Sequence, residues 1–155
     1  ALGFIERQLI GYEDEMVSLS ALSGITSQLH DALRERVWLK SGAYLIIQPT
    51  EALTVIDVNT GKNIAKKEMQ ENFLKVNIEA AEEIARQLRL RNISGIVIVD
   101  FINLEAKSAE SELLNVFGAA LKKDPVPTQI VEMTKLGLVE VTRKKIKKSL
   151  RESLS

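Results

Sequence analysis

The stretch Val55-Ile-Asp-Val-Asn-Thr-Gly61 is an apolar run that carries a carboxylate and an amide to its polar end, with a glycine just beyond. A second apolar run, Gly95-Ile-Val-Ile-Val-Asp100, ends in the same way and is soon followed by Asn103. Both runs are predicted to be strands. Two strands that each deliver an aspartate indicate a divalent-metal site.

The segment between these strands is predicted to be one long helix, from about 67 to 91, because its apolar residues recur every three or four positions. A helix between two strands is a crossover, which can make the strands parallel and bring them close together. Both aspartates then lie at the carboxyl ends of their strands, where α/β sheets usually bind ligands. Asn77 interrupts the apolar stripe of this helix and must find polar partners, for which the turn after Asp57 is one candidate.

The same patterns predict the other elements and a fold class. They are a helix at about 24–36, a hairpin of strands 43–47 and 53–58 around a turn at 48–51, a helix at 108–123, strands 128–133 and 138–141, and a basic amphipathic helix at 143–155. Strand 53–58 alternates poorly, as expected for a strand that is covered on both faces. This order predicts an α/β domain with a single mixed β-sheet and helices packed on it.

Composition excludes several classes of protein. A chain of 155 residues is long enough for one domain with a hydrophobic core. Its 21 basic and 21 acidic side chains balance, so the net charge gives no indication of an anionic partner. The chain has no cysteine, which removes disulfides and thiolate metal sites. Since no apolar run is long enough for a membrane span and no secretory leader is evident, a cytoplasmic protein is expected.

A hard cation such as Mg²⁺ suits the predicted aspartate pair, because Mg²⁺ takes oxygen ligands, keeps several waters and is commonly held by one or two carboxylates. Beside a phosphodiester, such an ion can polarise the phosphoryl oxygen and activate an attacking water. Asn59 and Asn103 could orient a water or the phosphate. The structural alternative is that Asp57 and Asp100 only close turns at the strand ends.

Basic side chains gather at two places, and each has two interpretations. Arg86, Arg89 and Arg91 end the long helix, where they suit either the negative end of the helix dipole or a phosphate group. The stretch from Arg143 onward is either an RNA-binding helix or a solvated basic face. His30, the only histidine, has no partner in sequence and is interpreted as an ordinary side chain.

Four stretches of the chain, in order, resemble the catalytic core of the ribonuclease E/G family. They are Thr50-Glu-Ala-Leu-Thr-Val-Ile-Asp-Val-Asn-Thr-Gly61, Asn77-Ile-Glu-Ala-Ala-Glu-Glu-Ile-Ala-Arg-Gln-Leu-Arg-Leu-Arg91, Gly95-Ile-Val-Ile-Val-Asp-Phe-Ile102 and Leu136-Gly-Leu-Val-Glu-Val-Thr-Arg143. The resemblance covers about 25–145 in one register. It implies a single-strand-specific endoribonuclease that cuts A/U-rich RNA to 5′-phosphate and 3′-hydroxyl ends in bacterial rRNA maturation and mRNA decay.

The resemblance also implies roles for individual residues. It assigns 1–40 to the helical end of an RNase H-like part and 41–155 to a DNase I-like catalytic subdomain. The family's magnesium ligands, which also accept Mn²⁺, fall on Asp57 and Asp100, and its active-site asparagine falls on Asn59. The residues expected to meet RNA are Lys62, Arg86, Arg89, Arg91 and Arg143.

Departures from the family pattern define further expectations. The family's S1 RNA-binding domain and 5′-monophosphate sensor have no counterpart here, and without cysteine there is no Cys-Pro-x-Cys zinc link, so no zinc is expected. Asn92 and Asn103 stand where aspartates are common, which would lower metal affinity. The chain is therefore interpreted as a piece of a longer enzyme, able to self-associate through exposed apolar surface, with a non-catalytic RNA-binding or scaffold module as the alternative.

Overall fold

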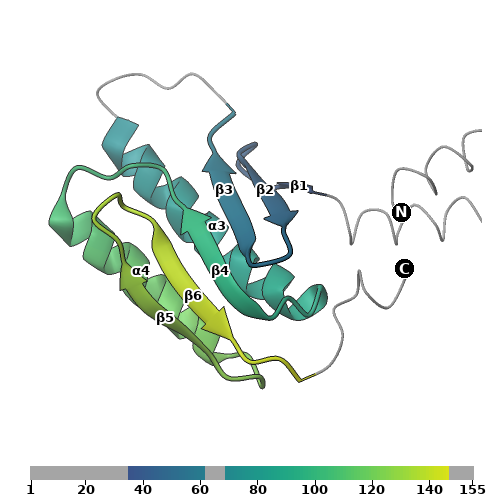
Figure 1. The fold of residues 1–155 in the computed structure, drawn as a ribbon. Coiled ribbons are helices and arrows are strands. Elements are labelled where there is room, and N and C mark those ends of the chain that lie inside the picture. The colour runs from purple at the N-terminus through teal and green to yellow at the C-terminus, as the bar shows by residue number, and fades with distance from the viewer. Residues whose placement is uncertain (1–34, 62–68, 147–155) are drawn as a thin grey trace, which may run out of the picture.

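The structure is a computed structural model that describes residues 35–61 and 69–146. These residues form a six-stranded mixed sheet with two packed helices, which confirms the predicted α/β fold (Figure 1). The elements in chain order are β1 (Arg36–Trp38), β2 (Tyr44–Pro49), β3 (Thr54–Asn59), α3 (Met69–Leu90), β4 (Gly95–Asp100), α4 (Lys107–Lys122), β5 (Thr128–Met133) and β6 (Val139–Arg143).

The strands lie in the order β1-β2-β3-β4-β6-β5. β3 and β4 are parallel neighbours joined through α3, as the crossover predicts, and the other neighbouring pairs are antiparallel. Their register pairs Thr54 with Val97 at one end and Asp57 with Asp100 at the other. The carboxyl ends of the two central strands, β3 and β4, therefore lie next to each other at the same end of the sheet.

The sheet has one covered face and one open face within the described part of the chain. Figure 1 shows α3 and α4 on the same side of the sheet. Burial along β3 accordingly alternates, with Thr54, Ile56 and Val58 buried and the residues between them partly exposed. The prediction that this strand is covered on both faces is therefore wrong, because both helices pack against the same side.

The core fills the space between the helices and the covered face. Its largest fully buried side chains are Phe117, Leu45, Ile47, Ile56, Ile84, Leu88, Leu113 and Leu121, together with valines of β4 and β6. Phe101 meets Phe117 edge to face, with ring centroids 5.4 Å apart, in the geometry that aromatic pairs favour. This contact fixes the chain just after β4 to helix α4.

The observed boundaries correct two predictions. Arg143 ends β6 instead of beginning a basic helix, and 147–155 lie outside the described residues. Arg36 begins β1, so the helix predicted at 24–36 does not extend to that residue, and 24–34, with His30, also lie outside the described part. β1 itself was not predicted. Neither described helix is both long and apolar enough to cross a membrane.

Candidate metal centre

Asp57 and Asp100 lie side by side on the open face of the sheet. They are directly paired in the parallel register of β3 and β4, and paired residues on neighbouring strands project to the same face, about 5 Å apart along the hydrogen-bonding direction. Asp57 stands between the buried Ile56 and Val58, so its own side chain is on the face away from the helices. The structure thus brings together the two carboxylates that the sequence singled out.

The electrostatics of Asp100 show that the two carboxylates interact. Partial desolvation raises the pKa of Asp100 above its usual value, and the negative charge of Asp57 raises it further. Like charges in contact are unfavourable unless a cation or proton lies between them. This pair is therefore suited to a bound cation.

Two carboxylates suit a magnesium ion that keeps waters as further ligands, and not an ion whose ligands all come from the protein. Within 35–61 and 69–146, no three His, Cys, Asp or Glu side chains cluster closely enough to hold a metal. Two carboxylates are what Mg²⁺ usually takes from a protein, since it keeps waters and substrate phosphates as its other ligands. The residues present therefore fit this ion.

Asn59 lies beside the carboxylate of Asp57. It is two residues further along β3 and therefore on the same face. Its Nδ2 atom donates a hydrogen bond of 3.4 Å to Oδ2 of Asp57. This long bond places the amide beside the carboxylate on the open face of the sheet.

Asn77 fixes the chain that follows Asp100. This fully buried side chain donates from Nδ2 to the carbonyl oxygen of Ile102 at 2.8 Å, and its Oδ1 accepts from the Ile102 N–H at 3.0 Å. The turn after Asp57 was one candidate partner of Asn77, and the structure gives these two bonds to the turn after Asp100 instead. Helix α3 therefore holds the position of one of the two carboxylates.

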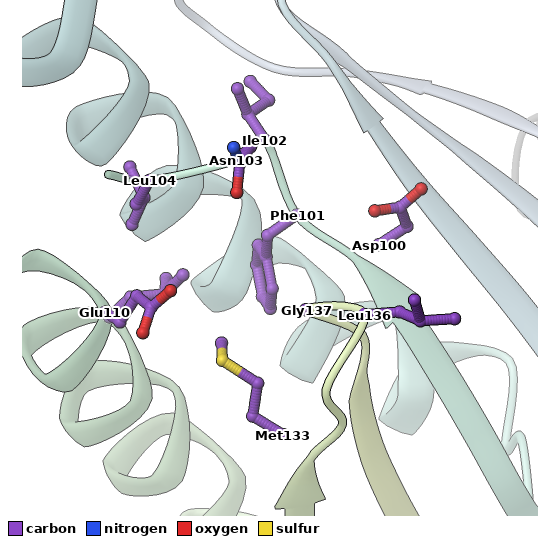
Figure 2. Close-up of a pocket in the computed structure, with 10 residues that line it drawn as sticks. Asp100, Phe101, Ile102, Asn103, Leu104, Glu110, Met133, Leu136 and Gly137 are labelled. Carbon is purple, nitrogen blue, oxygen red and sulfur yellow. The ribbon is translucent and has the colours of Figure 1, made fainter. Parts of the chain in front are cut away.

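A hollow of about 270 Å³ opens next to Asp100 (Figure 2). It is lined by Asp100, Phe101, Ile102, Asn103, Leu104, Glu110, Leu113, Met133, Leu136 and Gly137. Most of the lining side chains are apolar, but polar atoms make up more of the exposed lining than apolar atoms do, and the polar side chains are those of Asp100, Asn103 and Glu110. Asn103, expected near the metal, therefore belongs to this hollow. The hollow itself was not predicted, because its walls come from three separate segments.

The arginines at the end of α3 lie away from the aspartates. α3 starts after the carboxyl end of β3 and returns to the amino end of β4, so its last turn is at the opposite edge of the sheet. Arg86 is exposed and pairs with Glu83 at 2.8 Å. Arg91 is buried and donates from Nε to Oε1 of Gln87 at 2.8 Å. Arg89 is partly buried, and its Nη1 has no hydrogen-bond partner among the described residues.

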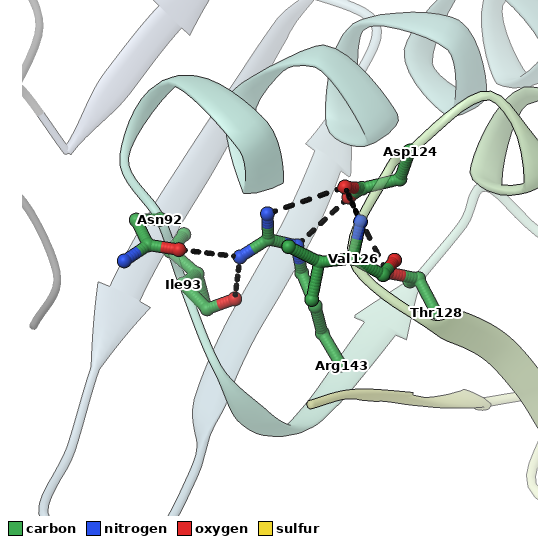
Figure 3. A network of polar contacts seen from close by, with 6 residues as sticks. All are labelled: Asn92, Ile93, Asp124, Val126, Thr128 and Arg143. Atoms are coloured by element: carbon green, nitrogen blue, oxygen red, sulfur yellow. Dashed lines mark hydrogen bonds and ion pairs between the residues drawn. The ribbon is translucent and has the colours of Figure 1, made fainter. Parts of the chain in front are cut away.

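Arg143 also lies at that opposite edge, where it pairs with Gly95 of β4. Its buried guanidinium forms a 2.8 Å ion pair with Asp124 and donates to Oδ1 of Asn92 at 2.8 Å and to the carbonyl of Ile93 at 3.0 Å (Figure 3). We call these four residues the Arg143 network. These contacts give Arg143 a structural role, and the expectation that it meets RNA stays a prediction.

The carboxylate of Asp124 is held ionised by this network. Burial acts to raise its pKa, but hydrogen bonds from the Arg143 side chain and the Val126 N–H, the Arg143 charge and the Thr128 hydroxyl together lower it. The net direction is downward. Lys62, the remaining residue expected to meet RNA, lies outside the described part of the chain.

Comparison with known proteins shows which family this chain matches. The family model described as "Ribonuclease E/G family" matches residues 5–146. The chain is similar to Ribonuclease E of Nostoc sp. (51% identical over 121 residues, 78% of this chain and 18% of the relative) and of Synechocystis sp. (45% over 147 residues, 95% and 22%). It is also similar to Ribonuclease G of Haemophilus influenzae (44% over 131 residues, 84% and 27%). The chain thus spans between 18% and 27% of the length of these relatives.

Proposed function

The chain belongs to the ribonuclease E/G family, and on this premise we propose that it is the magnesium-dependent catalytic core of a single-strand-specific endoribonuclease. Its reaction is hydrolysis of a phosphodiester bond in A/U-rich RNA, leaving 5′-phosphate and 3′-hydroxyl ends. The setting is rRNA maturation and mRNA decay in the cytoplasm. S1 and 5′-sensor domains would serve as its partners in the intact enzyme, and the matched part corresponds to the DNase I-like subdomain.

One observation carries this proposal: Asp57 and Asp100 are in register on neighbouring parallel strands, and the charge of one raises the pKa of the other. Two carboxylates on paired residues, at the carboxyl ends of neighbouring parallel strands, are an arrangement that favours a cation over an empty site. Asp57 and Asp100 would hold the ion from two rigid strands, so its position is fixed before RNA arrives.

The bound Mg²⁺, or Mn²⁺ in its place, would supply Lewis-acid chemistry at the phosphate and lower the pKa of the attacking water. The residues of this chain supply the geometry. Asn59 orients the carboxylate of Asp57 through its hydrogen bond. Asn77 fixes the backbone after Asp100. An open sheet face leaves room for an extended RNA strand to cross the two carboxylates.

A non-catalytic RNA-binding or scaffold module is the competing function. It is favoured by the position of Arg86, Arg89 and Arg91, which lie at the opposite ends of the strands from the aspartates. Such a module would bind RNA and leave it intact.

Cleavage of a short, labelled, A/U-rich single strand by the 155-residue chain separates the two functions. We expect Mg²⁺-dependent cleavage by the wild type and a loss of about 100-fold or more in Asp57→Asn and Asp100→Asn, because the ion contributes several kcal/mol to the transition state. Glu112→Gln, an exposed carboxylate on α4, is the matched control and should cleave normally.

The outcomes are distinct. Equal cleavage by wild type and both aspartate variants would remove the metal centre, and RNA binding without cleavage by the wild type would favour the module. Labelling the products tests the bond that breaks, since 5′-phosphate ends accept no further phosphate from a kinase until they are dephosphorylated.

A further inference from the structure

Three side chains of β1 and β2 form a compact group on the open face of the sheet. Trp38 and Tyr44 have ring centroids 5.0 Å apart, with an angle of 53° between the ring planes. The Arg36 guanidinium carbon lies 4.6 Å from the centroid of Tyr44 and 5.5 Å from that of Trp38. We call Arg36, Trp38 and Tyr44 the aromatic platform. Its geometry is that of a cation–π contact on a pair of rings.

The platform leaves a large aromatic surface in water. Trp38 is 57% exposed, whereas Phe101 and Phe117 are buried in the core. The structural interpretation is that Arg36 packs on these rings only to cover them. That contact still leaves more than half of Trp38 uncovered. An exposed aromatic next to a cation is a surface that binds planar partners.

The platform and the metal centre share one face. Trp38 pairs with Tyr44 across β1 and β2, and Tyr44 pairs with Asn59 across β2 and β3. Val37, which alternates with the platform residues, packs against the core on the other face. Trp38 is therefore two strand spacings from Asn59, roughly 10 Å. Such a separation is within reach of a nucleotide whose neighbour lies at Asp57.

We propose that the aromatic platform is a stacking site for a base of single-stranded RNA whose backbone crosses Asp57 and Asp100. This inference rests on the proposed function, because it needs RNA at the metal centre. Stacking of bases on aromatic side chains is a general mode of single-strand recognition and tolerates any sequence, since every base has a π-face. Arg36 adds positive charge for the adjoining phosphate at a place where the two aspartates repel it.

A second copy of the chain is a less suitable occupant of this edge. Among the strands of the described residues, β1 lies at the edge of the sheet, and an edge strand can pair with another strand. However, β1 has only three residues and carries the charged Arg36, and short, charged edge strands resist such pairing. The exposed feature is the ring surface on the sheet face, which favours a planar ligand over a pairing strand.

Tryptophan fluorescence reports the proposed contact directly, because Trp38 is the only tryptophan in the chain. We would mix the 155-residue chain with single-stranded RNA and Mg²⁺ in a stopped-flow instrument, so that binding at the metal centre is read before cleavage products accumulate. We expect saturable quenching by the single strand and none by a blunt duplex of the same sequence. In parallel, anisotropy of labelled RNA should give about tenfold weaker binding for Trp38→Ala, within the range for losing one stacked base.

Two variants separate stacking from a folding defect. Trp38→Phe keeps a ring and should recover most of the affinity lost in Trp38→Ala. Val131→Ala, which shortens an exposed side chain on β5 at the other edge of the sheet, is the matched control and should bind like the wild type.

Failure of this inference is distinct from failure of the proposed nuclease. Magnesium-dependent cleavage without fluorescence quenching, or with equal affinity in Trp38→Ala, would overturn the platform and leave the nuclease standing. Quenching that persists while Asp57→Asn cleaves like the wild type would support the platform and overturn the metal centre. Self-association that Trp38→Ala abolishes, with RNA binding unchanged, would overturn the platform in favour of a contact between copies.

Discussion

Asp100 carries a conflict between stability and chemistry at the scale of one residue. Its pKa is raised by partial burial and by the charge of Asp57. The native state therefore binds the proton more tightly than the unfolded chain does. Stability then falls as pH rises from the ordinary carboxyl pKa of about 3.8 through the raised native pKa. At neutral pH the ionised carboxylate is a small cost to the folded state.

Removing that charge should stabilise the fold. We expect Asp100→Asn to raise the free energy of unfolding at pH 7 by less than about 1 kcal/mol, because Asp100 is solvent-exposed. The gain should disappear below the window in which Asp100 titrates. Urea denaturation at pH 7 and pH 3 measures both effects, with Glu112→Gln as the exposed control. A variant less stable than wild type at pH 7 would contradict the repulsion between the two carboxylates.

Asn77 acts at the scale of elements, because it connects helix α3 to the turn after β4. We expect Asn77→Ala to cost about 2–3 kcal/mol, since it leaves the partly buried N–H and carbonyl of Ile102 without partners. Thermal denaturation measures this loss. Asn115→Ala removes an exposed asparagine from α4 and should change little.

The same variant tests whether Asn77 positions the metal site. Magnesium affinity, followed by the heat of binding at a temperature where the variant is folded, should fall more in Asn77→Ala than in Asn115→Ala. A loss of stability with unchanged magnesium affinity would make Asn77 a packing residue only.

Periodicity predicted most of the elements, and packing explains where it failed. The apolar spacing of α3 and α4 places each helix within two residues of its observed bounds. β1 has three residues and a single half-buried side chain, so no local pattern marks it, and it is a strand because it pairs with β2. The face of β3 was misjudged because Val55 is apolar but lies on the open side.

The local sequence pattern also predicted part of the candidate site, namely the two aspartates and their pairing. The two aspartates end apolar runs, which is visible in sequence, and their pairing follows from the crossover. The partner of Asn77 was not predictable, because the turns after Asp57 and after Asp100 both lie at the carboxyl edge of the sheet. The ion pair of Arg143 depends on Asp124, 19 residues away in another loop, and sequence alone places no such contact.

The Arg143 network stabilises the molecule as a whole, because it joins β6, the turn after α3 and the loop before β5. Asn92 takes a left-handed conformation, with φ of 49°, as residues that end helices often do, and presents its side chain to Arg143. Asp124 and Arg143 are both buried, with side chains 1% and 3% exposed. Removing one member therefore leaves the other charged and without its partner.

We expect Arg143→Met to destabilise the fold by about 3–5 kcal/mol, as is typical when one partner of a buried ion pair is removed. Adding Asp124→Leu should recover part of the loss, since two apolar side chains can replace a buried pair. Chemical denaturation of both variants measures this, and Lys144→Met, at the exposed next residue, is the control. Equal stability of Arg143→Met and wild type would show that the network contributes nothing.

The pH dependence of this pair has the opposite sign to that of Asp100. Because the native pKa of Asp124 is lowered, its contribution is present above the unfolded value of about 3.8 and is lost as pH falls through the native pKa. The double variant lacking Asp124 should therefore lose less stability than wild type between pH 4 and pH 2.

The two carboxylates and the buried ion pair lie at opposite ends of the central strands. The aspartates are at the carboxyl ends of β3 and β4, and the Arg143 network is near the amino end of β4. Variants that silence the chemistry need not loosen the fold, and the charge repulsion at Asp100 means that neutralising it tightens the fold. Under the proposed function, a variant with Asp100 neutralised would therefore bind single-stranded RNA without cutting it and could serve to capture the RNAs that this domain recognises.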